Sequence, residues 1–401
     1  MSALAPAADA AHAARWAIRL LMGRDPGEEE VAAAAASQPD ALALRDALLR
    51  SDAHAMGHDR GHPIRGDWGA APLAPEDVAA VHLLRHGRRA EAAALAEGLA
   101  RHADAAALRA EFLASPEFAA LCAAAGLGEG VAQVTVAGRA IRLRGRAHDG
   151  YWAGLAAGAL EPGVERLARL VAAALPDGGA GAVLVDAGAN IGLTALAMAA
   201  AAPRHERLIA IEADARNLPL LRRNLAENGL NGATVLDVAV GAERGRLTFR
   251  QAARNGAVGQ LVLPETEAAP RPGPKVRVER LDLLLRREGC RRLDLLKLDV
   301  EGAEEAALEG AGALPARART LAFVEFNLWT LMRVANRNPR AVLDGWAQRF
   351  PHMVGFTAAG DPWPLPDENE RLAFLHSVVV EQQGITDVVL CHDLGWLGRW
   401  A

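Results

Sequence analysis

The spacing of hydrophobic positions changes near Val131, and this change divides the chain into two regions. Before it, apolar residues recur at helical spacing, as in Leu108, Phe112 and Leu113. After it, short apolar runs typical of buried strands alternate with helical segments. The pattern predicts an all-α region over residues 1–126 and an α/β domain over residues 131–401.

The helical region contains an internal repeat. Leu20-Leu21-Met22-Gly23-Arg24 is echoed 64 positions later by Leu84-Arg85-His86-Gly87-Arg88, and the same offset relates Leu44-Arg45 to Leu108-Arg109 and Ser51 to Ser115. One offset that holds across several matches predicts two copies, over about 10–56 and 74–122, each of two or three helices. In the second copy, Ser115-Pro116 is typical of a helix N-cap followed by proline at the first helical position.

A stretch rich in Gly and Pro, from Gly57 to Pro75, separates the copies and predicts a loop. His54, His58 and His62 stand at i, i+4 spacing there, which on a helix could hold a metal. The intervening glycines and proline favour a solvated loop instead, so we expect no metal site. The three cysteines match neither a metal spacing nor a disulfide framework.

The second region predicts a doubly wound, Rossmann-like sheet of mostly parallel strands. It begins with a hairpin joined through Ala137-Gly138-Arg139 and a helix over 164–175. The alternating segments that follow are strands over 182–186, 208–212, 234–240, 293–298 and 321–326, with helices from 193 and over 218–228. His376, between apolar residues, is interpreted as a strand histidine.

Two segments of this region carry residues suited to a nucleoside ligand. Glycines directly after the first strand, in Asp186-Ala187-Gly188-Ala189-Asn190-Ile191-Gly192, let the backbone approach a ligand. Glu212 ends the next strand, where a carboxylate accepts bonds from ribose hydroxyls. A dinucleotide loop would need glycines at 190 and 193, but these are Asn190 and Leu193. S-adenosylmethionine has no phosphate and tolerates Asn190, so a methyltransferase is favoured.

The fourth strand ends in Lys297-Leu298-Asp299-Val300-Glu301-Gly302-Ala303-Glu304, with charged groups at the edge where open α/β sheets bind ligands. With this segment, the chain resembles the FkbM family of methyltransferases. The resemblance also includes Glu161-Pro162, the loop 186–192, Glu212 and Leu225-Ala226-Glu227-Asn228-Gly229, and covers roughly 131–390. It departs from the family at Ala213-Asp214, where proline is usual, and is weak after Phe326.

This resemblance implies S-adenosylmethionine as the donor and O-methylation of a sugar, glycan or natural-product hydroxyl. The residues expected at the donor are Glu161, Asp186, Gly188, Asn190, Gly192, Glu212 and Asp237. The catalytic candidates are Asp299 and Glu301 as general base, Lys297 as a neighbouring charge, and Glu325 as an acceptor contact together with Asn327. Asp237 could instead cap its strand, Glu161 could belong to a plain turn, and Glu301 and Glu304 could serve the dipole of the next helix.

The helical repeat resembles a small module found beside glycan-processing and surface-associated domains, carried here by Gly23-Arg24-Asp25-Pro26 and Phe112-Leu113-Ala114-Ser115-Pro116-Glu117-Phe118. That resemblance leaves two roles open: a docking or assembly platform for a protein partner, or a packing appendage.

Composition narrows the function classes. A net charge of -5 argues against a strongly basic surface for nucleic acid or membrane. Asp186 and Asn190 interrupt the most apolar stretch, and the N-terminus lacks a signal-peptide pattern, so we expect a cytoplasmic protein without a membrane span. The alternatives are a nicotinamide-dependent oxidoreductase, a non-enzymatic scaffold that uses the helical repeat, and an N-methyltransferase. Intact Asp186, Glu212 and Asp299 disfavour the scaffold, and the absence of an Asn/Asp-Pro-Pro-Tyr motif disfavours N-methylation.

Overall fold

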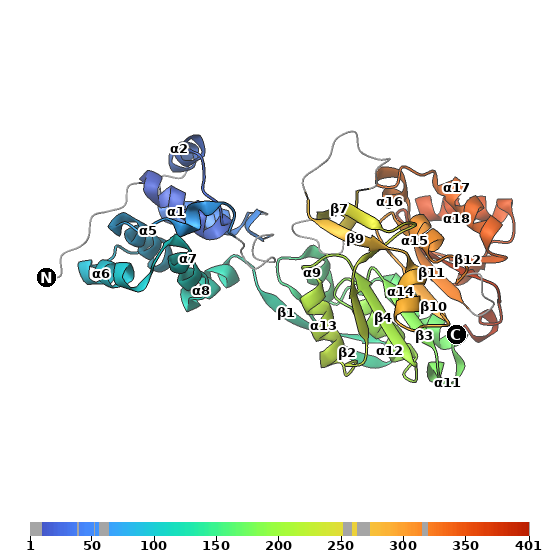
Figure 1. The fold of residues 1–401 in the computed structure, drawn as a ribbon. Coiled ribbons are helices and arrows are strands. Elements are labelled where there is room, and N and C mark those ends of the chain that lie inside the picture. The colour runs from blue at the N-terminus through green and yellow to red at the C-terminus, as the bar shows by residue number, and fades with distance from the viewer. Residues whose placement is uncertain are drawn as a thin grey trace. The chain divides into compact units, whose positions relative to one another are not determined.

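The computed structural model describes residues 10–37, 40–51, 53–55, 64–251, 259–262, 273–314 and 320–400. The chain divides into two compact units: residues 1–129 with 146–149, and residues 130–145 with 150–401 (Figure 1). Each unit has its own hydrophobic core.

The first unit is helical. Its elements are α1 (Ala10–Met22), α2 (Glu28–Ser37), α3 (Ala41–Leu49), the 3-10 helix η1 (Asp67–Ala70), α5 (Pro75–His86), α6 (Ala92–Arg101), α7 (Ala105–Leu113) and α8 (Pro116–Ala124). Helices α2 and α6 begin and end 64 residues apart, as do α3 and α7, so the offset read from the sequence also relates the helices. The second copy has four helices, more than the two or three expected. Ser115 caps α8, as predicted, through its bond from the Phe118 N–H.

The two copies exchange equivalent contacts. The Arg45 guanidinium donates to the Leu84 carbonyl (2.8 Å), and its counterpart Arg109 donates to the Leu20 carbonyl (2.9 Å). The rings of His54 and Phe118, also equivalent positions, lie 6.3 Å apart. Contacts in which residue i of one copy meets j of the other, and j meets i, require an approximate twofold relation. The helical unit is therefore an internal pseudo-dimer.

The segment between the copies differs in part from the expected loop. Residues 56–63, with His58 and His62, lie outside the described residues, and η1 follows them. His54 is fully buried in a helical turn, where its Nδ1 bonds the Leu21 carbonyl (2.9 Å). The structure thus gives His54 a packing role rather than a place in a solvated loop.

The second unit is built on an eight-stranded sheet, ordered β13-β12-β14-β11-β10-β3-β4-β5. The strands are β3 (Val183–Ala187), β4 (Arg207–Glu212), β5 (Thr234–Asp237), β10 (Leu295–Leu298), β11 (Leu321–Asn327), β12 (His352–Phe356), β13 (Pro362–Pro364) and β14 (Ile385–Cys391). Strands β3, β4, β5, β10 and β11 are parallel, and β14 enters antiparallel between β11 and β12. The predicted doubly wound α/β sheet is confirmed.

Helices cover both faces of this sheet (Figure 1). One face packs against α10 (Pro162–Ala174), α12 (Leu193–Ala201) and α13 (Leu218–Glu227), the other against α14 (Leu281–Arg287), α15 (Glu304–Gly310), α16 (Leu328–Arg333), α17 (Pro339–Arg349) and α18 (Glu368–Val380). Successive strand residues alternate between the two cores, so Leu184 faces the first and Val185 the second. The shorter helices α9 (Gly150–Ala156), α11 (Pro176–Gly179) and η2 (Leu397–Arg399) complete the unit.

Two sequence interpretations were wrong. The segment 234–240 is not one strand, because the chain leaves the large sheet after Asp237 and β6 (Ala239–Val240) pairs with β9 (Lys275–Glu279). That smaller sheet also contains β7 (Gly245–Gln251) and β8 (Gly259–Leu261). His376 is an exposed residue of helix α18 rather than of a strand. The valines after it resemble a strand, but Asp367 caps the helix and Phe374 and Val378 face the core at i, i+4 spacing.

The predicted hairpin is present as β1 (Glu129–Val136) and β2 (Arg139–Arg146). Ala137 and Gly138 both have positive φ, as a two-residue turn between twisted strands requires. Asn224 of α13 and Asn228, the residue that caps its C-terminus, each bond the backbone N–H and carbonyl of a β2 residue, Arg144 and Arg142 respectively. The Asn228 recognised in the sequence therefore fixes the edge of β2.

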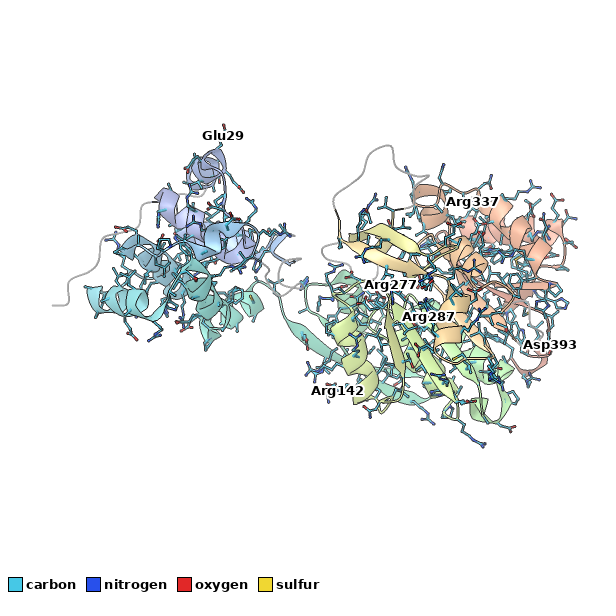
Figure 2. All side chains as sticks on the ribbon, viewed as in Figure 1. Glu29, Arg142, Arg277, Arg287, Arg337 and Asp393 are labelled. Carbon is cyan, nitrogen blue, oxygen red and sulfur yellow. The ribbon has the colours of Figure 1, made fainter. Side chains whose placement is uncertain are left out.

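Charged side chains such as Arg142, Arg337 and Asp393 lie at the surface of the second unit (Figure 2). Among the described residues, no helix is both long and apolar enough to cross a membrane.

The exchanged arginine bonds predict that both copies contribute to the stability of the helical unit. Arg45→Ala and Arg109→Ala each leave a carbonyl at a helix end without its donor, so we expect each to lower the free energy of unfolding by about 1–3 kcal/mol. The loss should be larger for Arg109, which is 3% exposed. Chemical denaturation measures this, with the exposed Arg89→Ala as the control. Two variants as stable as this control would refute the exchange.

Candidate active site

The site lies where the order of the sheet reverses, between β3 and β10. Chain connections run outward in opposite directions from these neighbouring strands, which leaves a crevice at their carboxyl ends. The loop after β3 approaches the end of β10 closely: the Asp299 N–H donates to the Ala187 carbonyl (3.2 Å). A Cβ added to Gly188 would lie 1.7 Å from the Asp299 carbonyl oxygen. Only glycine fits at that position.

A first cavity of about 940 Å³, open to solvent, begins at this loop. Its polar wall includes Glu161, Asn190, Glu212, Asp299 and Glu301. Its apolar wall includes Ile211, Val238, Ala239, Val240, Phe249 and Leu261. Phe249 and Leu261 belong to β7 and β8 of the smaller sheet, so this sheet forms one side of the cavity.

Glu212 is held in the wall of the first cavity by two backbone amides. Its Oε2 accepts from the Asn190 N–H and its Oε1 from the Asp214 N–H, each at 2.7 Å. A proline at position 214 has no backbone N–H, so it could not donate the second of these hydrogen bonds. Burial raises the pKa of Glu212 to about 7, although these amides counteract the increase.

Lys297 connects the loop after β3 to the end of β10. Its ammonium donates to the Gly188 carbonyl (3.0 Å) and lies 3.4 Å from Asp186 and 3.3 Å from Asp299. Burial alone would lower the pKa of Lys297, but Asp299 and Asp186 outweigh it and raise that pKa. Asp186 is fully buried and also accepts from the Thr194 hydroxyl (2.6 Å). Lys297 thus offsets two carboxylates and fixes the loop.

Glu301 and Glu304, adjacent in the sequence motif, have different environments. Glu304 accepts from the N–H groups of Val300 and Gly302 and stabilises its own turn at the start of α15. Glu301 precedes that helix, has a positive φ of 55°, and lines the first cavity. Burial, Asp299 and Glu304 raise the pKa of Glu301 to about 8. Glu304 therefore has the role of a carboxylate that stabilises the start of the next helix, whereas Glu301 faces the cavity.

A second cavity, of about 1320 Å³, adjoins the first. Five residues line both: Glu161, Thr194, Lys297, Asp299 and Glu325. The second cavity is also bounded by the start of α10, the segment after α18 and strand β14. Burial and the charges of Asp299 and Glu301 raise the pKa of Glu325 well above its usual value.

Glu161 lines both cavities, and an ion pair between Arg166 and Asp387 anchors the helix that follows it. Glu161 precedes α10, and Arg166 of that helix donates to Asp387 of β14 through Nε and Nη2, at 2.9 and 2.5 Å. Burial, followed by the charge of Asp299, raises the pKa of Glu161. Arg166 and Asp387 thus anchor the start of α10 to a strand distant in sequence.

The residues selected from sequence do not all reach a cavity. Glu161, Gly188, Asn190, Glu212, Lys297, Asp299, Glu301 and Glu325 line the first cavity. Among the described residues, Asp186, Gly192 and Asp237 are absent from its wall. Asp186 is behind the loop, the backbone of Gly192 (φ 99°) turns against Leu221, and Asp237 is exposed at the end of β5 while Val238 faces the cavity. Asn327 caps α16 through its side chain.

Several lining residues were missed from sequence. Thr194 stands two residues after Gly192 at the start of α12, so its position next to the glycine loop could have indicated it as a site residue. Arg166, Thr386 and Asp387 had none, because β14 reaches the site only through its pairing with β11. Within the part of the chain that the structure describes, no cluster of three or more His, Cys, Asp or Glu suits a metal ion.

The fold and site together define a Rossmann-like α/β domain with a ligand-binding crevice at the carboxyl ends of its central strands. Residues 186–343 match the model of the methyltransferase FkbM domain. Methyltransferase sdnD of Sordaria araneosa is 32% identical over 154 residues, which cover 32% of this chain and 59% of the relative. The chain therefore spans less than two thirds of this curated relative's length.

Two solved methyltransferase structures match part of this chain. The methyltransferase FkbM from Methylobacillus flagellatus KT is 17% identical, with 53% of this chain and 43% of that chain covered and a TM-score of 0.32. The O-methyltransferase from Bacillus cereus in complex with SAH is 14% identical, with 60% and 96% covered and a TM-score of 0.29.

The contact at Gly188 predicts a strong effect of a single methyl group. In Gly188→Ala the new Cβ meets backbone and also requires an unfavourable positive φ, so we expect a loss of more than about 3 kcal/mol in unfolding free energy. Gly229→Ala is the matched control, because Gly229 has φ 83° but nothing within 4 Å of the added Cβ. The control should lose only about 1 kcal/mol. Equal losses in thermal or chemical unfolding would contradict the contact.

Proposed function

We propose that the second unit transfers a methyl group from S-adenosylmethionine to a hydroxyl oxygen of a second substrate. The observation that carries this proposal is the shared wall: the first cavity meets the second at Glu161, Thr194, Lys297, Asp299 and Glu325. A transfer enzyme needs two substrates whose reacting atoms meet. We assign residues 131–401 to this catalytic domain and residues 1–126 to the helical repeat.

The first cavity fits the donor. Its Glu212 carboxylate is placed to accept bonds from a ribose diol, and its apolar wall of Val238, Phe249 and Leu261 fits an adenine ring. The Asn190 side-chain oxygen is buried without a hydrogen-bond partner among the described residues, so it has capacity for a ligand donor. Glu161 and the Gly188 backbone lie toward Asp299, where the amino-acid end of the donor would bind.

The donor supplies an electrophilic methyl group on a sulfonium. The remaining work falls to residues of the shared wall: alignment of the acceptor hydroxyl and removal of its proton as the carbon–oxygen bond forms. Burial and the charge of Asp299 raise the pKa of Glu301 to about 8 and raise the pKa of Glu325 well above its usual value, so both side chains favour the protonated form. Asp299, ion-paired with Lys297, is therefore our candidate for the base. Protonated Glu325 would donate a hydrogen bond to the acceptor.

Glu212 predicts how donor affinity depends on pH. The ionised carboxylate accepts both ribose hydroxyls, so donor affinity should fall by about tenfold from pH 8 to pH 6 as Glu212 becomes protonated near pH 7. Glu212→Gln should weaken binding by about 10- to 100-fold at pH 8 and remove most of the pH dependence. Isothermal calorimetry at several pH values measures both.

The unliganded protein should show the opposite sign for stability. Because the folded-state pKa of Glu212 is raised, the contribution of Glu212 to the free energy of unfolding is complete below about pH 4.5 and is lost as the pH rises through 7.

Unchanged donor affinity in Glu212→Gln, with the fold intact by circular dichroism, would remove Glu212 from the donor site.

Asp299 predicts a separation of turnover from donor binding. Asp299→Asn keeps the size of the side chain but removes the base, so turnover should fall by about 100-fold or more while donor affinity stays within a few-fold. Glu301→Gln should cause a smaller loss, since Glu301 already carries a proton at neutral pH. Methyl uptake into an acceptor gives turnover, and calorimetry gives affinity. Loss of donor binding in Asp299→Asn would transfer Asp299 to the donor site.

A further inference from the structure

The second cavity carries more carboxylates than cations. Among the described residues that line it, the acidic ones are Glu161, Asp299, Glu325, Glu381 and Asp387, and the basic ones are Arg166 and Lys297. These carboxylates come from different elements, so the excess is a product of the fold.

Both cations of this cavity are already bound to carboxylates of the protein. Arg166 is paired with Asp387 through two nitrogens. Lys297 is shared among Asp186, Asp299 and the Gly188 carbonyl, and only 5% of its side chain is exposed. A phosphate or carboxylate on a ligand would have to take a cation from one of these partners and leave a buried charge uncompensated.

The same wall is rich in hydrogen-bond acceptors. The carboxylates present their remaining lone pairs, and Gln382 and Gln383 add amide groups from the segment after α18. Thr386 of β14 is 1% exposed, and its hydroxyl has no hydrogen-bond partner among the described residues. A buried polar group in this state is satisfied when a ligand binds it.

We propose that the second cavity binds the acceptor through a portion that carries several hydroxyl or ammonium donors and no anionic group. A neutral sugar, an amino sugar or a comparable polyol has this chemistry, whereas a sugar phosphate or a uronic acid does not. This inference rests on the proposed function, because it concerns the substrate that meets the methyl group at Asp299.

The second cavity should distinguish neutral and cationic ligands from anionic ligands, because the charge of the ligand meets the charge of the cavity wall. Hydroxyl and ammonium groups gain charge-assisted bonds from the carboxylates of Asp299, Glu381 and Asp387, whereas an anionic substituent meets the repulsion of these three groups in a half-buried space. The raised pKa of Glu325 and of Asp387, each caused first by burial and increased by Asp299, reports the same crowding of negative charge.

The test uses sugars of matched ring configuration that carry one neutral, cationic or anionic substituent. Methyl glycosides with gluco, galacto and manno configuration, each as the neutral sugar, the 2-amino sugar, the uronate and the 6-phosphate, are compared by ligand-observed NMR with the full chain. The same set is offered for methyl uptake from labelled S-adenosylmethionine. We expect the neutral and amino members to bind at least about tenfold more tightly than the anionic members of the same configuration. Equal or preferential binding of anionic members overturns the proposal, as does failure of every neutral and amino member to bind.

Two variants separate the cavity from a general effect of charge. Glu381→Lys adds a cation at the mouth of the cavity, so it should reduce the discrimination against anionic members by about three- to tenfold. Glu206→Lys is the matched control, since Glu206 is an exposed acid that precedes β4 at the opposite end of the parallel strands. Equal effects of both variants would count against the second cavity.

Thr386→Val tests the hydroxyl. It keeps the shape of the side chain, so the stability of the protein should be unchanged, while binding of the preferred sugar should weaken by about three- to tenfold. A purely structural threonine would leave sugar binding unaltered, and that result would remove Thr386 from the site.

Failure of this inference is distinguishable from failure of the proposed function. Calorimetry with S-adenosylhomocysteine reports the donor site alone, and the NMR comparison is made with and without this ligand. Donor binding together with a preference for anionic sugars refutes only the inference. A neutral-sugar preference without any donor binding refutes the proposed function and leaves the selectivity of the cavity standing.

Discussion

The close approach between the loop after β3 and the end of β10 is the constraint on which the site depends. Gly188 lies where a side chain would collide with the Asp299 carbonyl oxygen, and the Lys297 ammonium bonds the Gly188 carbonyl from the neighbouring strand. These contacts hold the loop at the edge of the sheet where the strand order reverses. They also fix where Asp299 can lie relative to a ligand in the first cavity. Displacing the loop would therefore disturb both cavities together.

The carboxyl groups at this edge of the sheet differ in their electrostatic environment, and so in the roles they can have. Burial first, and then the charge of Asp299, raises the pKa of Glu301 and of Glu325, while Asp299 itself is paired with Lys297. Groups that hold a proton and a group that can take one are thus adjacent, which suits removal of a hydroxyl proton during transfer. The same crowding makes the second cavity a poor place for an anion.

The helical unit is stabilised in a different way, by contacts between its two repeat copies. A duplicated sequence folds as two copies that exchange equivalent bonds, Arg45 to one helix end and Arg109 to the other. Each arginine thus donates to a carbonyl near the C-terminal end of a helix in the other copy, where helix carbonyls lack partners within the helix. The repeat was visible in the sequence at a constant offset, but the exchange was not, because it joins residues of different copies.

The sequence by itself determined the local features of this protein: the α/β alternation, the 64-residue repeat, the glycine loop and the motif from Lys297 to Glu304. Each of these is a pattern within one short segment or at a fixed spacing, and propensity and periodicity act at that range. Tertiary structure decided which of these residues face a cavity. It buried Asp186 in β3, turned Gly192 against Leu221, and left Asp237 exposed and His376 on a helix. It also brought Arg166, Thr386 and Asp387 to the second cavity. Those outcomes depend on strand pairing across long sequence separations, such as that of β11 with β14, which no local pattern records.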